Sequence, residues 1–349
     1  MAVPTLLRFE DCASWAKTVE PYIPQLYELP SKVVDVVQGR QDLLNLYTQT
    51  NPLISGFAIS VALGGVFLVV AEFNKNYSQV DRCWSILPTF YIAHFDLWAR
   101  LAGVPSQRID AILVFGIAWS ARLTYNYWRK GGYTVGSEDY RWEIIQKHIP
   151  VWAFKLLNVT FISFMQSVIL FLLAAPVYPI LLTTQFRPDL GASDVAFLAW
   201  ELLLVASEWV SDGQQWDFHI AKQTYQKTAT IPQGWKVDDL NRGFLTSGLW
   251  KYSRHPNFAA EQTIWLSLYI WSAISTNTTF TWASAGVINL IWIFASSTIL
   301  TEWISAGKYP EYKEYQRQVG KFMPMSIGGY QPPAIAPAKA KNLGKTKKT

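Results

Sequence analysis

The stretch SGLWKYSRHPNFAAEQTIWLSLYIW, residues 247–271, joins a basic, polar segment directly to an apolar run that can enter a lipid bilayer. Such a border is typical of a helix that begins at a membrane surface. Pro256 is favoured in the first turn of a helix, so we expect the helix to begin near that residue. Asn257 and Glu261 are then four residues apart on one face. The stretch therefore predicts a membrane helix with a polar face at its start.

The composition of the whole chain also favours a membrane protein. Half of the 349 residues are apolar, 15 % are aromatic and 16 % are charged, whereas an ordinary soluble domain is roughly 25 % charged. The net charge of +5 comes largely from the C-terminal tail, which argues against a nucleic-acid-binding surface. Cys12 and Cys83 make neither a disulfide framework nor a zinc site, and no metal site is predicted.

Seven segments are candidate membrane spans, because a span needs about 20 mostly apolar residues. They lie at 53–72, 84–100, 110–128, 152–182, 193–211, 258–275 and 280–301. The predicted fold is an all-α membrane protein with about seven transmembrane helices, and Pro176 and Pro179 are expected to kink the fourth helix or end it early. We expect a non-cytosolic N-terminal segment over 1–52, a membrane domain over 53–325 and a disordered basic tail over 326–349.

The distribution of Lys and Arg predicts the orientation. The links 129–151 and 212–257 are basic, as is the tail, so the C-terminus is predicted to face the cytosol. The link that contains Arg100 and Arg108 breaks this rule mildly. Lys345 and Lys347, fifth and third from the end, resemble the dilysine retrieval signal of endoplasmic reticulum membrane proteins. The expected location is therefore the endoplasmic reticulum membrane, with several spans.

Polar residues interrupt the fifth candidate span and its continuation, LLVASEWVSDGQQWDFHIAKQ (203–223). Glu208, Asp212, Gln215 and His219 fall on one stripe of a helix. A carboxylate that faces lipid costs several kcal/mol, so the acids must face a wet cavity or a partner, and we expect Asp212 to face water. A polar clamp between helices explains any one of these residues taken alone equally well.

A second polar set follows at the start of the sixth candidate span. Arg254 and His255 precede Asn257 and Glu261. Cations and free N–H groups at a helix start bind phosphates, and an amide with an acid binds sugar hydroxyls or a carboxamide. The set is a candidate site for a phosphate-bearing polar ligand. The simpler alternative is that Arg254 anchors to lipid phosphate and His255 caps the helix.

Five motifs together resemble the steroid 5α-reductase-type membrane reductases, in particular an uncharacterised branch of that superfamily. They are GLWKYSRHPNFAAE, the block E-x3-D-x-Q-x3-F from Glu208 to Phe218, EYKEYQRQVGKFMP, NKNYSQVDRCW and ARLTYNYWRKGGYTVGSEDYRW. The resemblance covers about 70–325. It implies a seven-helix bundle that holds NADPH at its cytosolic side, with a lipid-facing cavity for a steroid-like or isoprenoid-like substrate.

The resemblance also implies roles for individual residues. Asp212 corresponds to a nucleotide-binding aspartate, Asn257 to the asparagine near the nicotinamide carboxamide, and Glu261 to a neighbouring acid. His219 stands where classical steroid reductases carry an arginine, so recognition of the 2′-phosphate would fall to Lys222 or Arg254. The other expected cofactor contacts are Gln214, His255, Tyr312 and Tyr315.

The expected function is NADPH-dependent reduction of a conjugated C=C bond in a steroid, isoprenoid or other lipid. Hydride transfer to an enone builds charge on the carbonyl oxygen, and a protein acid must stabilise that charge. The candidates are Asp81, Tyr125 and Glu208, with Tyr77 a further one, and the sequence does not choose among them. The implied partners are the substrate and membrane lipids, with no nucleic acid and no protein partner.

Two alternatives stay open. The RHPN stretch and the later EYKEYQRQVGKFMP are also close to integral-membrane methyltransferases that bind S-adenosylmethionine. Those enzymes lack the block from Glu208 to Phe218, and they usually carry paired acids near the last helix, where this chain offers Glu302 alone. The reductase is therefore the favoured prediction. The other alternative is a non-catalytic lipid-binding membrane protein of the same fold.

Overall fold

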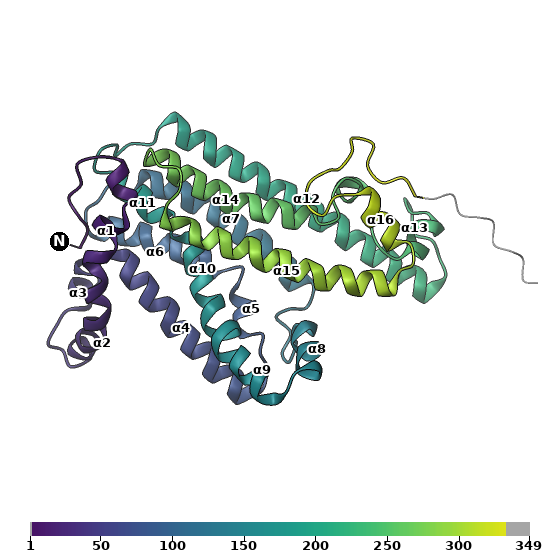
Figure 1. The fold of residues 1–349 in the computed structure, drawn as a ribbon, viewed down its shortest axis with the longest axis horizontal. Helices are drawn as coiled ribbons and strands as arrows, with labels where there is room; N and C mark the ends of the chain where they lie inside the picture. Colours follow the sequence, from purple (N-terminus) through teal and green to yellow (C-terminus); the bar gives the residue numbers. More distant parts are fainter. Residues whose placement is uncertain (1, 333–349) are drawn as a thin grey trace, which may run out of the picture. The chain divides into compact units, whose positions relative to one another are not determined.

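The structure is a computed structural model that describes residues 2–332, and it is mostly helical, with no strand among these residues (Figure 1). The α-helices are α1 Trp15–Thr18, α2 Ile23–Val37, α3 Leu43–Gln49, α4 Pro52–Asn74, α5 Gln79–Cys83, α6 Leu87–Leu101, α7 Gln107–Arg129, α8 Tyr140–His148, α9 Val151–Leu157, α10 Gln166–Ala174, α11 Val177–Thr183, α12 Ala192–Thr228, α13 Val237–Arg242, α14 Pro256–Ser275, α15 Ala285–Lys308 and α16 Tyr312–Gln318. A π-helical segment, Asn158–Met165, joins α9 to α10.

The chain divides into two compact units. The first comprises the chain up to Asp212 together with Asn257–Leu300, and the second comprises Gly213–Pro256 together with the chain from Thr301 onward. Helices α12 and α15 each contribute residues to both units. The boundaries predicted at residues 52 and 325 stay predictions, and Lys345 and Lys347 lie outside the described residues.

Each of the seven candidate spans is largely helical, and α14 begins at Pro256 as expected. Three helical segments of the described chain are long and apolar enough to cross a membrane, namely Pro52–Asn74, Val151–Thr183 and Trp282–Lys308. They indicate a membrane protein. The second of these segments breaks between Ala174 and Val177, which confirms the interruption expected at Pro176.

The other four candidates are helices of a different character. Helix α6 has 15 residues, fewer than a perpendicular span requires. Helices α7, α12 and α14 carry ionisable or amide side chains within their apolar runs, among them Arg122, Glu208 and Glu261. A bundle with seven spans therefore stays a prediction.

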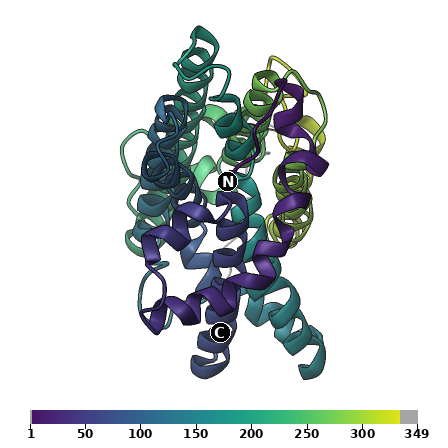
Figure 2. The same ribbon diagram turned by 90° about the vertical axis from the view of Figure 1, so that its left-hand side faces the viewer.

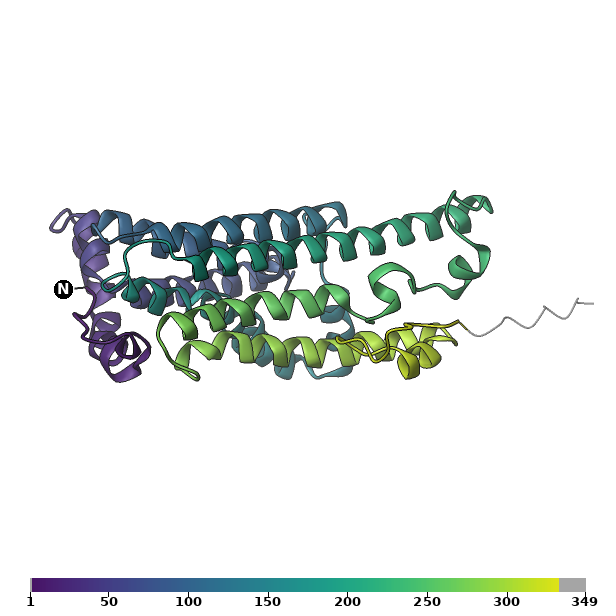
Figure 3. The same cartoon turned by 90° about the horizontal axis from the view of Figure 1, so that it is seen from above.

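Within the first unit, α7 and α14 run alongside the parts of α12 and α15 that belong to this unit, as Figures 1 and 3 both show. Large aromatic side chains fill the core, and Trp98, Trp119, Trp265 and Trp271 are fully buried. Gly286 permits a close approach of α15 to α10, because a Cβ atom at this position would collide with the backbone of Leu172. Backbones come this close only where a side chain is missing.

Two buried ion pairs fix the register of α7 against α12. Arg108 Nη2 lies 2.8 Å from Asp194 Oδ1, and Arg122 pairs with Glu208 fourteen residues further along each helix. The two helices therefore run parallel over about 21 Å, at 1.5 Å per residue. Arg108 is 1 % exposed, so it cannot serve as a basic residue at the membrane surface, which explains why its link departs from the charge rule.

The N-terminal helices pack on one end of the first unit, and Figure 2 looks onto them in purple. The Tyr178 hydroxyl donates to the Thr18 carbonyl at 3.0 Å and accepts from Asn51 Nδ2 at 2.7 Å. Asn51 also caps α4 through a hydrogen bond from the Leu53 amide. These contacts attach the N-terminal segment to α4 and α11.

The Arg108–Asp194 pair yields a stability prediction. Replacing Arg108 with Leu leaves a buried carboxylate without its cation, which should lower the free energy of unfolding by about 3–5 kcal/mol. The matched control is Arg40→Leu, since Arg40 and its partner Asp35 are both exposed to solvent, where an ion pair contributes about 0–1 kcal/mol. Denaturation in detergent measures both, and equal losses would contradict the prediction.

Candidate functional site

A cluster of buried charges lies where α7, α12 and α14 meet in the first unit. Arg122 on α7 donates through Nη1 to Asp212 Oδ2 at 2.9 Å, and through Nη2 to Glu208 Oε2 at 2.5 Å and Glu261 Oε2 at 3.1 Å. All four residues are at most 8 % exposed. We call these four residues the Arg122 cluster.

The helices place these side chains through their periodicity. Glu208 and Asp212 are one turn apart on α12, so both reach the same guanidinium. Glu261 accepts further hydrogen bonds from Trp119 Nε1 at 3.0 Å and Trp265 Nε1 at 2.8 Å. One guanidinium faces three carboxylates, so the two indole N–H groups supply donors that Arg122 alone cannot provide.

Asp212 does not face water, contrary to the expectation from the sequence. Its side chain is 4 % exposed and pairs with Arg122 at 2.9 Å. The predicted stripe ends here, because Gln215 and His219 belong to the second unit and His219 is exposed. The helical periodicity correctly placed Glu208 and Asp212 on one face of α12, but it could not show that a cation on another helix lies against that face.

Two buried polar atoms next to Asp212 have no hydrogen-bond partner among the described residues. Asn257 Nδ2 donates to Asp212 Oδ1 at 3.2 Å, which leaves Asn257 Oδ1 without a donor. Arg122 Nε likewise has no acceptor. Buried polar atoms are nearly always paired, so this acceptor and this donor, both on residues that contact one carboxylate, mark a place where a ligand group can bind.

Two further cations approach Asp212 from the end of α7. Arg129 Nη2 donates to the Asp212 carbonyl at 2.9 Å, and Arg129 Nε donates to Asn126 Oδ1 at 3.0 Å. Lys130 follows Arg129 as the C-cap residue of α7, and its charge interacts with that of Asp212. The positive charges of Arg129 and Lys130 therefore border the Arg122 cluster.

Tyr125 lies outside the Arg122 cluster and lines a groove on another face of α7. Its ring stacks on Trp209 with centroids 5.4 Å apart, and the Arg129 guanidinium lies 5.5 Å from its centroid. The groove has a volume of about 700 Å³. Its walls carry hydroxyl groups among apolar side chains, and they include Thr89, Ser120, Thr124, Tyr125, Trp128 and Tyr133.

Asp81 and Tyr77 are not members of the Arg122 cluster. They connect the segment 74–84 with the segment 121–142, and both segments carry motifs of the resemblance. Asp81 Oδ2 accepts from Trp142 Nε1 at 2.8 Å, and the Tyr77 amide donates to Glu138 Oε1 at 2.6 Å. Burial raises the pKa of Asp81. A catalytic role for either residue stays a prediction.

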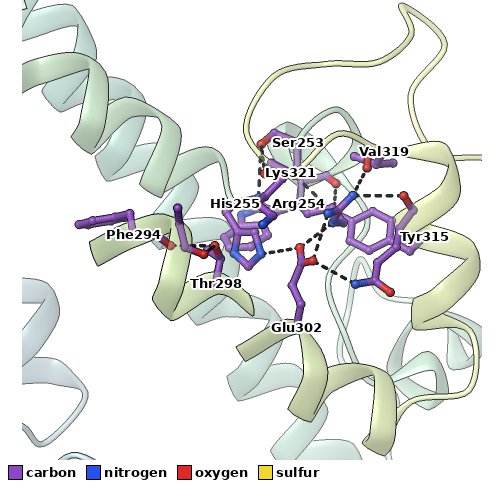
Figure 4. Close-up of polar contacts among 12 residues, drawn as sticks. Ser253, Arg254, His255, Phe294, Thr298, Glu302, Tyr315, Val319 and Lys321 are labelled. Carbon is purple, nitrogen blue, oxygen red and sulfur yellow. Dashed lines mark hydrogen bonds and ion pairs between the residues drawn. The ribbon is translucent and has the colours of Figure 1, made fainter. Parts of the chain in front are cut away.

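The second unit holds Arg254 and His255 in a network of their own (Figure 4). Arg254 Nε and Nη2 donate to the two oxygens of Glu302 at 2.7 and 3.1 Å, and Arg254 Nη1 donates to the carbonyls of Gln316 and Val319. His255 Nε2 lies 2.9 Å from Glu302 Oε1. The sequence carries a signal for this partnership that was not used, because Glu302 is an acid within an apolar run and therefore needs a partner.

The other expected cofactor contacts also lie in the second unit. Gln214 Oε1 accepts from the Leu249 amide at 3.0 Å, and Lys222 Nζ donates to the Gly243 carbonyl at 2.7 Å. Tyr312 and Tyr315 are buried, and the Tyr315 hydroxyl donates to the Trp250 carbonyl. Burial raises the pKa of both tyrosines. Binding roles for these residues, and for Arg254, His255 and His219, stay predictions.

Arg122 is the central residue of the cluster that sequence analysis did not name as a site residue. A signal was present, because a cation inside the apolar run 110–128 must find an acid or face water. The partner could not be chosen from the sequence, since Glu208, Asp212 and Glu261 all sat on predicted inner faces. In the structure, Arg122 contacts all three.

Comparison with known proteins places the chain in a family. Residues 67–319 match the family described as "Protein of unknown function (DUF1295)", and the chain belongs to this family, which is related to steroid 5α-reductase-like proteins. The chain is also 39 % identical over 330 residues to the uncharacterized protein C594.04c of Schizosaccharomyces pombe, with 94 % of each chain covered. No solved structure matches the chain.

The Arg122 cluster yields a second stability prediction. Arg122→Gln leaves three buried carboxylates without their shared cation and should lower the free energy of unfolding by about 3–5 kcal/mol. Adding Glu208→Gln should restore part of the loss, because it removes one of the repelling charges. Denaturation of the single and double variants in detergent forms a mutant cycle. Strictly additive losses would show that the four groups do not act as one cluster.

Proposed function

We propose that this protein is an NADPH-dependent reductase of a conjugated C=C bond in a steroid-like, isoprenoid or other lipid. Its family is related to steroid 5α-reductase-like proteins, and its long apolar helices fit a substrate that dissolves in the bilayer. The observation that carries the proposal is the pair of unpartnered buried atoms beside Asp212, Asn257 Oδ1 and Arg122 Nε.

A primary carboxamide complements this pair. It offers an N–H donor for Asn257 Oδ1 and a carbonyl acceptor for Arg122 Nε. The nicotinamide of NADPH carries such a group, and the residues present therefore fit it. Asp212 would hold Asn257 and Arg122 in place through the hydrogen bonds that both residues donate to its carboxylate. When bound, the cofactor would supply the hydride.

The surrounding residues have defined tasks in this proposal. Glu208 and Glu261 fix the orientation of the Arg122 guanidinium through the ion pairs that both form with Nη2. Arg129 and Lys130 provide positive charge at the border of the cluster, and such charge favours the phosphates of a dinucleotide. Trp119 and Trp265 keep water away from the carboxylates by enclosing Glu261.

The groove on α7 is the proposed place for the lipid. Its volume of about 700 Å³ falls within the ordinary range for ligand sites of about 300–1,000 Å³. Tyr125 lines the groove, and its ring lies under the Arg129 guanidinium. Arg129 also donates to the Asp212 carbonyl, so it connects the groove with the Arg122 cluster. The Tyr125 hydroxyl is the proposed donor to the substrate carbonyl oxygen, where negative charge develops.

Cofactor binding provides the direct test. NADPH should raise the melting temperature of the wild type in detergent, by the amount that corresponds to RT ln(1 + [L]/Kd). Asn257→Leu should weaken NADPH binding about tenfold or more, since it removes the acceptor for the carboxamide. The control is Gln262→Leu on the same helix, because the Gln262 amide bonds to its own helix at the Phe258 carbonyl.

The same measurement separates the reductase from the alternatives. A wild type that is stabilised by S-adenosylmethionine and not by NADPH would overturn the reductase and favour a membrane methyltransferase. Stabilisation by neither cofactor would favour a non-catalytic lipid-binding protein. Equal NADPH affinity in Asn257→Leu and Gln262→Leu would show that the nicotinamide does not bind next to Asp212.

We also propose that the protein resides in the endoplasmic reticulum membrane with the 212–257 segment and the C-terminus in the cytosol. The basic residues of that segment support this orientation. Lys227 is exposed, so Lys227→Cys in a background with Cys12→Ser and Cys83→Ser should react with an impermeant thiol reagent added to sealed, cytosol-side-out microsomes. If the Lys227→Cys variant reacted only after the membrane was permeabilised, the 212–257 segment would face the lumen and the proposed orientation would be wrong.

A further inference from the structure

A small basic pocket lies within the second unit, where the ends of α12, α13 and α15 meet. Its volume is about 210 Å³, and its polar lining includes Lys222, Asn241, Gly243, Lys308 and Tyr309. This volume lies below the usual range of about 300–1,000 Å³ for whole ligands. The pocket therefore suits one functional group of a ligand rather than a complete large molecule.

Two ammonium groups converge on one phenol in this pocket. Lys222 Nζ donates to the Tyr309 hydroxyl at 2.9 Å, and it lies 4.8 Å from the centre of the Tyr309 ring. Lys308 Nζ lies 5.3 Å from the same centre. Burial would raise the pKa of Tyr309, but the hydrogen bond from Lys222 and the charges of both lysines outweigh it and lower that pKa. Positive charge thus dominates the pocket.

No carboxylate of the described chain lies within ion-pair distance of Lys222 or Lys308. Two acids of the same unit, Asp239 and Glu311, pair with Arg242 instead, at 2.8 and 3.0 Å. Lys222 is only 9 % exposed, and an ammonium has three N–H donors. Two of these are used, by the Gly243 carbonyl and the Tyr309 hydroxyl, and one is available to a ligand.

The backbone around Gly243 is shaped for this arrangement. Gly243 ends α13 with φ of +85°, a conformation that favours glycine. A Cβ atom at this position would also collide with the Tyr309 ring. Glycine therefore lets the Tyr309 ring lie against the turn while the Gly243 carbonyl holds Lys222.

We propose that this pocket binds a phosphate monoester group, held by Lys222 and Lys308 with the Asn241 side chain as a further polar contact. Such a group carries up to two negative charges and three acceptor oxygens, which match two ammonium groups without a carboxylate. The source of the group is either a soluble nucleotide phosphate or the headgroup of an anionic lipid. Lys222 is also an expected contact of the NADPH 2′-phosphate, so the nucleotide source rests on the proposed function, whereas the lipid source does not.

The test uses the full chain in phosphatidylcholine nanodiscs. Binding is measured by thermal shift with inorganic phosphate, with adenosine 2′-phosphate against adenosine, and with phosphatidic acid included in the disc. Lys308 is exposed, so Lys308→Gln should fold normally and should weaken phosphate binding about tenfold or more. Lys313→Gln is the matched control, since Lys313 is an exposed lysine of the same unit outside the pocket.

The outcomes are distinct. Binding of adenosine 2′-phosphate that Lys308→Gln weakens identifies a nucleotide phosphate, whereas a response to phosphatidic acid alone identifies a lipid headgroup, and both support the site. A wild type that responds to none of the three probes overturns the proposal. So does equal binding by the wild type, Lys308→Gln and Lys222→Gln. Asn257→Leu should leave phosphate binding unchanged, which separates a failure here from a failure of the reductase proposal.

Discussion

The burial of the Arg122 guanidinium among three carboxylates is the constraint on which the first unit depends. Moving charges out of water costs several kcal/mol for each ion, and only close partners offset it. The partners come from α12 and α14, so α7 cannot leave its position without exposing unpaired charges to an apolar interior. One guanidinium leaves two formal negative charges in excess, which explains why indole N–H groups and further cations surround the cluster.

The same constraint sets the register of the helix pair. Arg108 and Arg122 are fourteen residues apart on α7, and so are Asp194 and Glu208 on α12. Glu201 lies seven residues from both Asp194 and Glu208 on α12, and its carboxylate oxygens have no partner among the described residues. A slip by one turn would separate both outer pairs, so the two ion pairs outweigh the unfavourable position of Glu201 between them.

The sequence predicted the helices well and the partnerships poorly, for a physical reason. Apolar runs and Pro256 locate helices because these signals are local. Asp212 and Asn257 were placed on inner faces correctly, and the structure joins them with one hydrogen bond. The expectation that Asp212 faces water was wrong because its partner, Arg122, lies 90 residues away in the chain. The partnership of Arg254 with Glu302 was missed because Arg254 was interpreted as a surface cation.

Charge decides which ligand groups each polar site can accept. In the first unit, the Arg122 cluster has three carboxylates and one guanidinium, so it favours a neutral polar group, and only its border with Arg129 and Lys130 favours an anion. A carboxamide fits this condition, whereas a phosphate placed among three carboxylates would be repelled. The pocket of the second unit has two ammonium groups and no carboxylate of its own, so it favours an anion. The two sites therefore accept groups of different charge, a neutral amide in the first unit and an anion in the second.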